Sequence, residues 1–465
     1  MIKKATILLT ILMSVTWCTA QTISGRVSSS TNQVINLHGF KGFESYTIGS
    51  AVTDNSGNFK LGYSVTDHGM GYLTDSDNKP LYVVINGENI YLVGEQLGHP
   101  ETIIIKKGKE NQWLKQYSEE NPRREQALSA WEYLDERYSL DTLFSVHKTP
   151  NMAIKVEKRR IYAENAAFLA KLPQKSYLRW FIPTRKLVSS APEVLKSRRH
   201  ELHNTIKAFR ALDYADEWLY KSGFLKDAIE SHFMLLESSG RPMDSINVDM
   251  QRSINAMLLH LLKDQEKLNE VTTYLFDMLE RHSIFTASEY LAIKVLNETS
   301  CTINSNLTKQ LETYRIMKKG NTAPDIVFSG DNYSSTYDTS SFPKKLSDIK
   351  SKYTVIVFGA SWCPKCTQEL PEMAKYYSKW KAKDIEVVFV SLDEDQAAYR
   401  KFAKDLPFVS TCDLKKWASP IANDYYVIGT PTMYLLDDQR KILLRPNSVK
   451  QMDAWVDWFL IEGNK

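Results

Sequence analysis

The chain has 465 residues, of which 43% are hydrophobic and 25% are charged, and its formal net charge is +4. This small charge excludes proteins that bind nucleic acid or anionic membranes mainly through an excess of basic residues. The length suggests roughly three domains. Five cysteines in so long a chain exclude a fold held together chiefly by disulfides.

The first twenty residues have the pattern of a secretory signal peptide. A short basic start precedes the uncharged apolar residues 5–17, and small residues lead up to Ala20. This pattern predicts cleavage after Ala20 and export to the periplasm or cell envelope. Lipidation of Cys18 stays open as an alternative, although the bulky Trp17 before it disfavours that processing. No other segment has the ~18 apolar residues of a membrane helix, so we expect no span in the mature chain.

Residues 21–108 have the alternation and the turns of β-structure. Asn-Gly and Ser-Gly turns separate short alternating segments, which predicts a small antiparallel sandwich or barrel. We expect strands near residues 22–27, 57–63, 81–85, 90–93 and 102–105.

Residues 109–319 have apolar side chains at steps of three and four, which predicts a helical region. Its prolines are expected between helices or in their first turns. His200 and His203 are three residues apart, whereas the metalloprotease pattern requires a spacing of four, so we assign them no metal. Five prolines define the expected boundaries, namely Pro122, Pro173, Pro183, Pro192 and Pro242.

Residues 320–465 alternate between apolar and amphipathic segments, which predicts an α/β domain with a partly parallel sheet and a final antiparallel hairpin. We expect strands at about 353–359, 385–391, 408–411, 432–436 and 441–445, and helices at about 364–382, 394–405, 415–424 and 448–461. The whole chain is thus predicted to be multidomain, with a signal peptide at 1–20, an antiparallel β domain at 21–108, an all-α region at 109–319 and an α/β domain at 320–465.

A Cys-x-x-Cys pair, Cys363 and Cys366, stands where a predicted strand ends and a helix begins. The unpaired N–H groups and the dipole of a helix N-terminus stabilise a thiolate. Cys363 is therefore expected to have a lowered pKa and to act as a nucleophile. Cys366, one turn further on, can attack a mixed disulfide and resolve it.

A Cys-x-x-Cys pair can also belong to a zinc site or to a structural disulfide. A structural zinc site needs four ligands, and no second Cys-x-x-Cys accompanies this one, so we expect no metal. An inert structural disulfide is disfavoured by the exposed strand-to-helix position next to Trp362 and Pro364. Cys301 and Cys412 could bridge two regions or be buried free thiols, and the sequence does not decide between these.

Residues 320–465 resemble the TlpA/ResA-like exported thiol–disulfide oxidoreductases, which have the thioredoxin fold. The resemblance rests on Ala323-Pro324-Asp325, on residues 358–366, on Pro371 in the following helix and on Gly429-Thr430-Pro431-Thr432. The region 21–108 more weakly resembles a small β domain of the DUF4369 kind, which often precedes such modules in exported proteins of the Bacteroidetes.

The resemblance implies a role for each matching residue. Cys363 attacks, Cys366 resolves, and Pro431 forms a cis peptide bond beside them. Thr430 offers its backbone to an extended substrate, while Trp362 covers the disulfide. The implied docking residues are Trp362, Pro364, Lys365, Thr430 and Pro431.

Proton transfer is expected to differ from that of ordinary thioredoxins. Those carry a buried aspartate six residues before the first cysteine, where this chain has Val357. Glu369 matches a glutamate that affects thiol acidity in the ResA-like proteins, although a solvated helix surface explains it equally well. Lys365 places a positive charge within the motif and favours the thiolate.

The implied function is an exported reductase of protein disulfides that takes electrons from a membrane thiol donor and needs no dissociable cofactor. Two alternatives stay open. One is a cell-envelope binding or scaffold protein with an accessory thioredoxin module. The other is a peroxiredoxin-like peroxidase, which the absence of a Pro-x-x-x-Thr-x-x-Cys pattern disfavours.

Overall fold

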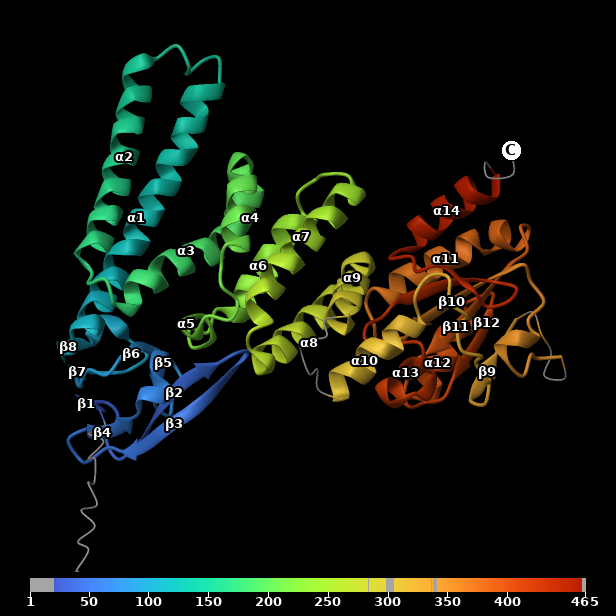
Figure 1. The fold of residues 1–465 in the computed structure, drawn as a ribbon, viewed down its shortest axis with the longest axis horizontal. Helices are drawn as coiled ribbons and strands as arrows, with labels where there is room; N and C mark the ends of the chain where they lie inside the picture. The colour runs from blue at the N-terminus through green and yellow to red at the C-terminus, as the bar shows by residue number, and fades with distance from the viewer. Residues whose placement is uncertain (1–20, 283, 298–304, 336, 338–340, 462–465) are drawn as a thin grey trace, which may run out of the picture. The chain divides into compact units, whose positions relative to one another are not determined.

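A computed structural model describes residues 21–282, 284–297, 305–335, 337 and 341–461 (Figure 1). The predicted signal peptide with Cys18, and also Cys301, lie outside these residues. The chain divides into two compact units. The first contains the residues up to Phe209 together with Asp213–Leu235, and the second contains Arg210–Leu212 and the residues from Leu236 onward. The domain boundaries proposed from the sequence remain predictions.

Two four-stranded sheets face each other in the first unit. Apolar side chains from both sheets, such as Ile23 and Leu92 from one and Leu37 and Leu73 from the other, form one buried cluster. The sheets have the orders β4-β1-β7-β8 and β3-β2-β5-β6. Their strands are β1 (Gln21–Val27), β2 (Val34–Lys41), β3 (Glu44–Val52), β4 (Asn58–Tyr63), β5 (Gly69–Thr74), β6 (Leu81–Ile85), β7 (Ile90–Gly94) and β8 (Ile104–Lys107).

The expected β domain is confirmed, with one parallel pair, β1 with β7, among the antiparallel ones. Strands β2, β3 and β5 were missed. The side chains of β3 are largely exposed, and nearly all of those of β5 are buried, so neither strand has a buried-and-exposed alternation. Glycine and histidine interrupt the apolar residues of β2.

Helices follow the sheets in the first unit. Asn111 of α1 ties that helix to β6 through two 2.8 Å hydrogen bonds with the Val84 backbone. Glu110 accepts a hydrogen bond from the N–H of Leu178 at 2.8 Å and so fixes the start of α3. The helices are α1 (Lys109–Leu140), α2 (Lys148–Lys171), α3 (Tyr177–Lys196), α4 (Leu202–Arg210), α5 (Glu217–Tyr220) and α6 (Leu225–Glu237).

The expectation that prolines mark helix boundaries is wrong at three positions. Pro122 lies inside α1, and Pro183 and Pro192 lie inside α3. Proline removes one helical hydrogen bond, and the packing of a long helix can offset that loss.

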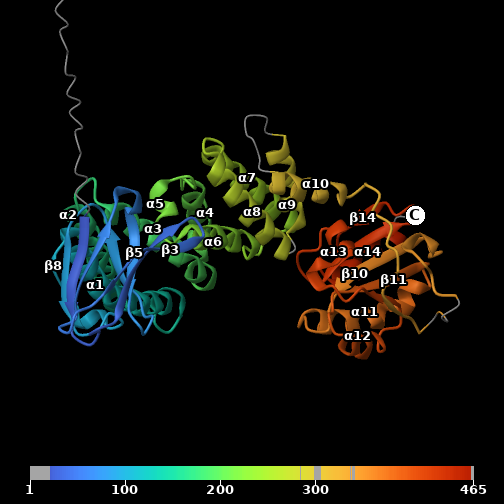
Figure 2. The ribbon, with the colours of Figure 1, turned by 90° about the horizontal axis from the view of Figure 1, so that it is seen from below.

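In the described part of the second unit, helices α7 to α10 precede a six-stranded sheet of order β14-β13-β10-β11-β12-β9. Strands β10, β11 and β14 of this sheet are labelled in Figure 2. The helices are α7 (Met243–Leu261), α8 (Gln265–Arg281), α9 (Phe285–Leu296) and α10 (Ser305–Ile316). The strands are β9 (Asp331–Tyr333), β10 (Tyr353–Gly359), β11 (Ile385–Ser391), β12 (Val409–Cys412), β13 (Thr432–Asp437) and β14 (Ile442–Leu444).

Strands β10, β11 and β12 are parallel, and the outer pairs are antiparallel. The predicted α/β alternation is confirmed, and β9 was missed because it is a polar strand of only three residues. The helices that accompany the sheet are α11 (Cys366–Lys381), α12 (Gln396–Ala403), α13 (Pro420–Asp424) and α14 (Val449–Ile461). Of all the helices described, none has the length and apolar character that a bilayer span requires.

Candidate active site

The two cysteines lie at the carboxyl end of β10, where the chain turns into α11. The backbone N–H of Cys366, the first residue of α11, donates a hydrogen bond to the Sγ of Cys363 at 3.2 Å. This N–H belongs to the set that a helix start leaves without an intrahelical partner. The sulfur of Cys363 is therefore placed where a thiolate is stabilised.

Both sulfurs are well covered. Cys363 is 5% exposed and Cys366 is fully buried. Burial, together with the hydrogen bond to Cys363, raises the pKa of Cys366 to about 12. Cys366 thus holds its proton at neutral pH. This is consistent with the roles expected from the sequence, in which Cys363 is the first nucleophile and Cys366 resolves the mixed disulfide.

The loop between α13 and β13 completes the site. The peptide bond between Thr430 and Pro431 is cis, as the resemblance implied. The Sγ of Cys363 donates to the carbonyl oxygen of Thr430 at 3.4 Å. Thr430 and Pro431 are half-buried, so the structure brings the predicted nucleophile next to a loop that still faces solvent.

Trp362 forms an exposed aromatic surface beside the cysteines. Its Nε1 donates to the carbonyl oxygen of Leu392 at 3.3 Å, and its ring is 45% exposed. The ring of Trp417 packs edge-on against it at 6.0 Å, and the Nζ of Lys416 lies 5.6 Å from its centre. Pro364 and Lys365 are exposed in the turn that follows.

Asp393 supports the turn before Trp362 and was missed in the sequence. It is 1% exposed and accepts hydrogen bonds from the N–H and the Oγ of Ser361, at 3.1 Å and 2.7 Å, and from the Oγ of Ser391 at 2.7 Å. Gly359 and Ser391 are paired across the parallel strands β10 and β11. The residues that follow two parallel strands meet at one sheet edge, and that signal could have identified Asp393.

Glu369 joins two helices. Its Oε2 accepts a hydrogen bond from the N–H of Val449, the first residue of α14, at 2.8 Å. A carboxylate at a helix N-terminus is favourable because of the unpaired N–H groups there. The predicted effect of Glu369 on thiol acidity remains a prediction.

Cys412 is a buried free thiol whose Sγ donates to the carbonyl oxygen of Asp393 at 3.4 Å, and burial raises its pKa. A bridge to Cys301 stays untested because Cys301 lies outside the described residues. Within the part of the chain that the structure describes, no three His, Cys, Asp or Glu side chains converge as a metal site would require.

Comparison with known proteins places this site in context. A family model described as thioredoxin-like matches residues 351–442. The thiol–disulfide oxidoreductase ResA of Oceanobacillus iheyensis is 33% identical over 143 residues, which are 30% of this chain and 69% of that protein. ResA of Bacillus thuringiensis is 34% identical over 101 residues, which are 21% of this chain. The chain spans only 57% of the length of that second relative.

Two solved structures are also similar. A thioredoxin-like protein from Bacteroides caccae is 16% identical, with a TM-score of 0.39, and the match covers 55% of this chain and 92% of that one. A thiol:disulfide interchange protein DsbE from Chlorobium tepidum is 31% identical, with a TM-score of 0.25, covering 30% of this chain and 96% of that one.

The raised pKa of Cys366 predicts a pH dependence of the reduced protein. The folded state holds this proton more tightly than the unfolded state, so the stabilisation is complete below the ordinary value of 9.0 and is lost as the pH rises toward about 12. The reduced protein should lose stability relative to the oxidised protein by about 1.4 kcal/mol per pH unit in that window. Urea unfolding of both forms measures the difference, and a flat difference from pH 9 to 11 would contradict the assignment.

Glu369→Gln separates two roles of this carboxylate. The amide still accepts the hydrogen bond from Val449 but lacks the charge. If Glu369 acts on thiol acidity, the pH profile of Cys363 alkylation by iodoacetamide shifts to lower pH. If it serves only α14, the profile is unchanged and the protein is destabilised by about 0.5–1 kcal/mol. Glu372→Gln, a change of the same kind on α11, is the control.

Proposed function

We propose, because this chain belongs to the ResA-like thiol–disulfide oxidoreductases with a thioredoxin fold, that its Cys363/Cys366 pair reduces disulfides of protein clients. The observation that carries this proposal is the pair of contacts at the Cys363 sulfur. It receives the N–H of Cys366 at 3.2 Å and lies 3.4 Å from the carbonyl oxygen of Thr430. The first contact favours the thiolate. The second, which the protonated thiol makes, places the sulfur beside the backbone of Thr430, where an extended client can reach it.

The reaction is a two-step exchange of sulfur–sulfur bonds. The Cys363 thiolate attacks one sulfur of the client disulfide, that bond breaks, and the departing client sulfur takes up a proton. Cys366 then loses its proton and attacks the Cys363 sulfur. The second client thiol departs, and Cys363 and Cys366 are left joined. Two electrons have passed to the client, and an external dithiol must return them.

The resemblance to the TlpA/ResA-like proteins supports reduction over oxidation as the direction of the reaction. We further propose that the reaction takes place in the periplasm or cell envelope and that a membrane thiol protein supplies the electrons, which the predicted signal peptide supports.

Reduction of insulin disulfides tests the function. The wild-type protein should accelerate the reaction with dithiothreitol as the electron source, and Cys363→Ser should lower it to the uncatalysed background. Cys366→Ser should accumulate a mixed disulfide with the client, because the resolving thiol is missing. Cys412→Ser, which removes another buried thiol, is the matched control and should retain activity. Turnover of hydrogen peroxide without insulin reduction would instead favour the peroxidase alternative.

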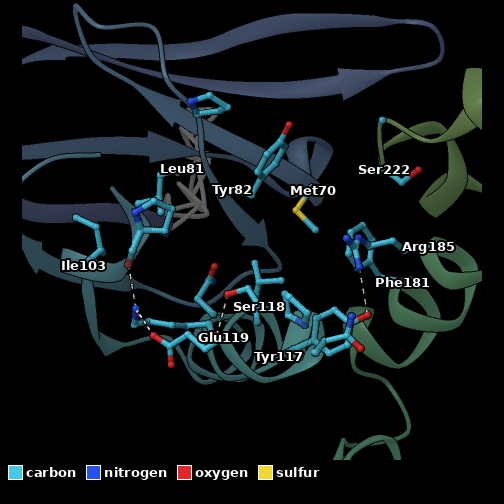
Figure 3. A pocket seen from close by; sticks show the side chains of 18 of the residues that line it. Met70, Leu81, Tyr82, Ile103, Tyr117, Ser118, Glu119, Phe181, Arg185 and Ser222 are labelled. Carbon is cyan, nitrogen blue, oxygen red and sulfur yellow. Dashed lines mark hydrogen bonds and ion pairs between the residues drawn. The ribbon is translucent and has the colours of Figure 1, made fainter. Parts of the chain in front are cut away.

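A cavity in the first unit favours an additional binding function for that part of the chain. It has a volume of about 720 Å³ and is shown in Figure 3. Its size falls within the range of small-molecule sites. The lining is largely apolar, with Phe40, Met70 and Phe181 among its residues.

The lining contains the carboxylates of Glu101, Glu119 and Asp227 and two basic side chains, Lys115 and Arg185. Lys115 pairs with Glu119 at 2.7 Å, whereas Arg185 contacts Tyr117. The Nη1 of Arg185 donates to the hydroxyl of Tyr117 at 3.3 Å, and its guanidinium lies 6.0 Å from the centre of that ring. A guanidinium at the edge of an apolar cavity pairs well with a carboxylate. We therefore propose a ligand with an apolar body and one acidic group.

Binding of cis-parinaric acid, monitored by its fluorescence, tests this cavity. Arg185→Leu should weaken binding about tenfold, because a charge-assisted hydrogen bond is lost. The methyl ester of the same compound should bind the wild type as weakly as the acid binds the variant. Lys186→Leu, at the neighbouring exposed residue of α3, is the control. Equal binding of acid and ester by the wild type would count against the proposed ligand class.

A further inference from the structure

The C-terminal end of α8 lies against the loop that carries the cis proline. A Cβ atom built on Gly429 would lie 4.0 Å from the Cα of Arg281, the last residue of α8. Thr430, whose carbonyl oxygen contacts the Cys363 sulfur, directly follows Gly429. A helix outside the matched residues 351–442 therefore reaches the rim of the candidate active site.

A buried ion pair holds α8 in this place. Glu280, the residue before Arg281, is fully buried at its side chain and pairs with Arg445 at 2.5 Å. Ser288 of α9 donates its hydroxyl to the same carboxylate. The guanidinium of Arg445 stacks on the ring of Phe285 at 3.7 Å. Because Arg445 directly follows β14, this pair joins α8 and α9 to the edge of the sheet.

An aromatic cluster also joins the loop to these helices. Phe276 of α8, Tyr314 of α10 and Tyr426 meet edge to face, with ring centres 5.0, 5.4 and 5.5 Å apart. Tyr426 lies three residues before Gly429. The helices and the cis-proline loop thus share one packed core, so their relative position is well defined.

Arg281 is left on the outside of this contact. Glu280 points into the core, whereas the next two residues, Arg281 and His282, are both exposed. The Nε of Arg281 donates to the carbonyl oxygen of Asp277 in its own helix at 3.3 Å. The Cα of Arg281 thus lies next to Gly429, and its exposed side chain carries a positive charge at the surface of this end of α8.

We propose that the end of α8 forms one wall of the groove in which Cys363 meets its client, and that Arg281 favours protein disulfides flanked by acidic residues. This inference rests on the proposed disulfide exchange. A client strand paired with the backbone of Thr430 must pass Gly429, and so it must pass Arg281. A charge at the rim of a binding surface acts on capture of the partner and is weakened by salt. The sulfur chemistry itself is unchanged.

Two disulfide peptides that differ only in the residues beside the cysteine, Asp-Asp or Lys-Lys, test the proposal. Their kcat/KM values are normalised to the rate with hydroxyethyl disulfide, which is small and neutral. The wild type should prefer the acidic peptide, and Arg281→Glu should lower its normalised kcat/KM about tenfold, mainly through KM. Arg281→Lys should retain the preference. Lys294→Glu, an exposed residue of α9, makes the same change in charge and should have no effect.

The outcomes are distinguishable from failure of the proposed function. A wild type that reduces neither peptide nor hydroxyethyl disulfide contradicts the exchange reaction itself. A wild type that reduces all three, but whose preference is the same in Arg281→Glu, contradicts only the role of Arg281. The preference should also shrink when the ionic strength is raised to about 0.5 M, because exposed charges are then screened. A preference that salt does not alter would point to shape instead of charge and would overturn the proposal.

Discussion

The hydrogen bond from the N–H of Cys366 to the sulfur of Cys363 exists because a strand and a helix meet at this point. Strand β10 is buried on both faces and ends at Gly359, where a Cβ atom would lie 3.3 Å from the Cys366 sulfur. The absence of a side chain there lets the helix start close to the sheet. Asp393 then fixes the intervening turn through Ser361. The position of the nucleophile thus depends on how one parallel pair of strands ends.

The buried pair of Glu280 and Arg445 has a different role. Removing two charges from water is costly, and such pairs stabilise a fold only when other contacts satisfy them. Here Ser288 donates to the carboxylate, and the rings of Phe285, Tyr314 and Tyr434 lie 3.7, 5.5 and 5.2 Å from the guanidinium. The Nε and Nη1 of Arg445 are buried and donate no hydrogen bond within the described part of the chain, so the pair is only partly satisfied. Loss of either partner would leave one charge buried alone, at a cost of about 3–5 kcal/mol. The pair therefore makes one particular docking of the helices far more favourable than a shifted one.

Prediction from the sequence succeeded where the spacing of apolar residues or a short motif is typical of one structure. The five strands predicted in 320–465 are all present, because their apolar runs are separated by amphipathic helices. Strands β3 and β9 were not recognised, since partly exposed or very short strands lack a clear alternation. The cysteines and the cis proline were found through local motifs. The contacts of Asp393 with Ser361 and of Arg281 with Gly429 connect residues far apart in the chain. The first could be expected only from the pairing of β10 with β11, and the second is encoded by no local pattern.

The residues that match the thioredoxin-like family model carry the proposed disulfide chemistry, whereas residues outside the match contribute to the proposed recognition of clients. The thioredoxin-like match covers residues 351–442 and includes both cysteines, Thr430 and Pro431. Arg281 and the aromatic residues of α8 and α10 lie outside it. A nearly buried dithiol reacts with any disulfide that can approach it. Selectivity among clients must therefore come from the surfaces around the two cysteines. In this chain a helix from outside the matched residues supplies one of those surfaces, and Trp362 with Trp417 forms a second exposed surface beside the nucleophile. Clients are then distinguished by the residues that flank their cysteines, because those residues must pass these surfaces before the sulfurs meet.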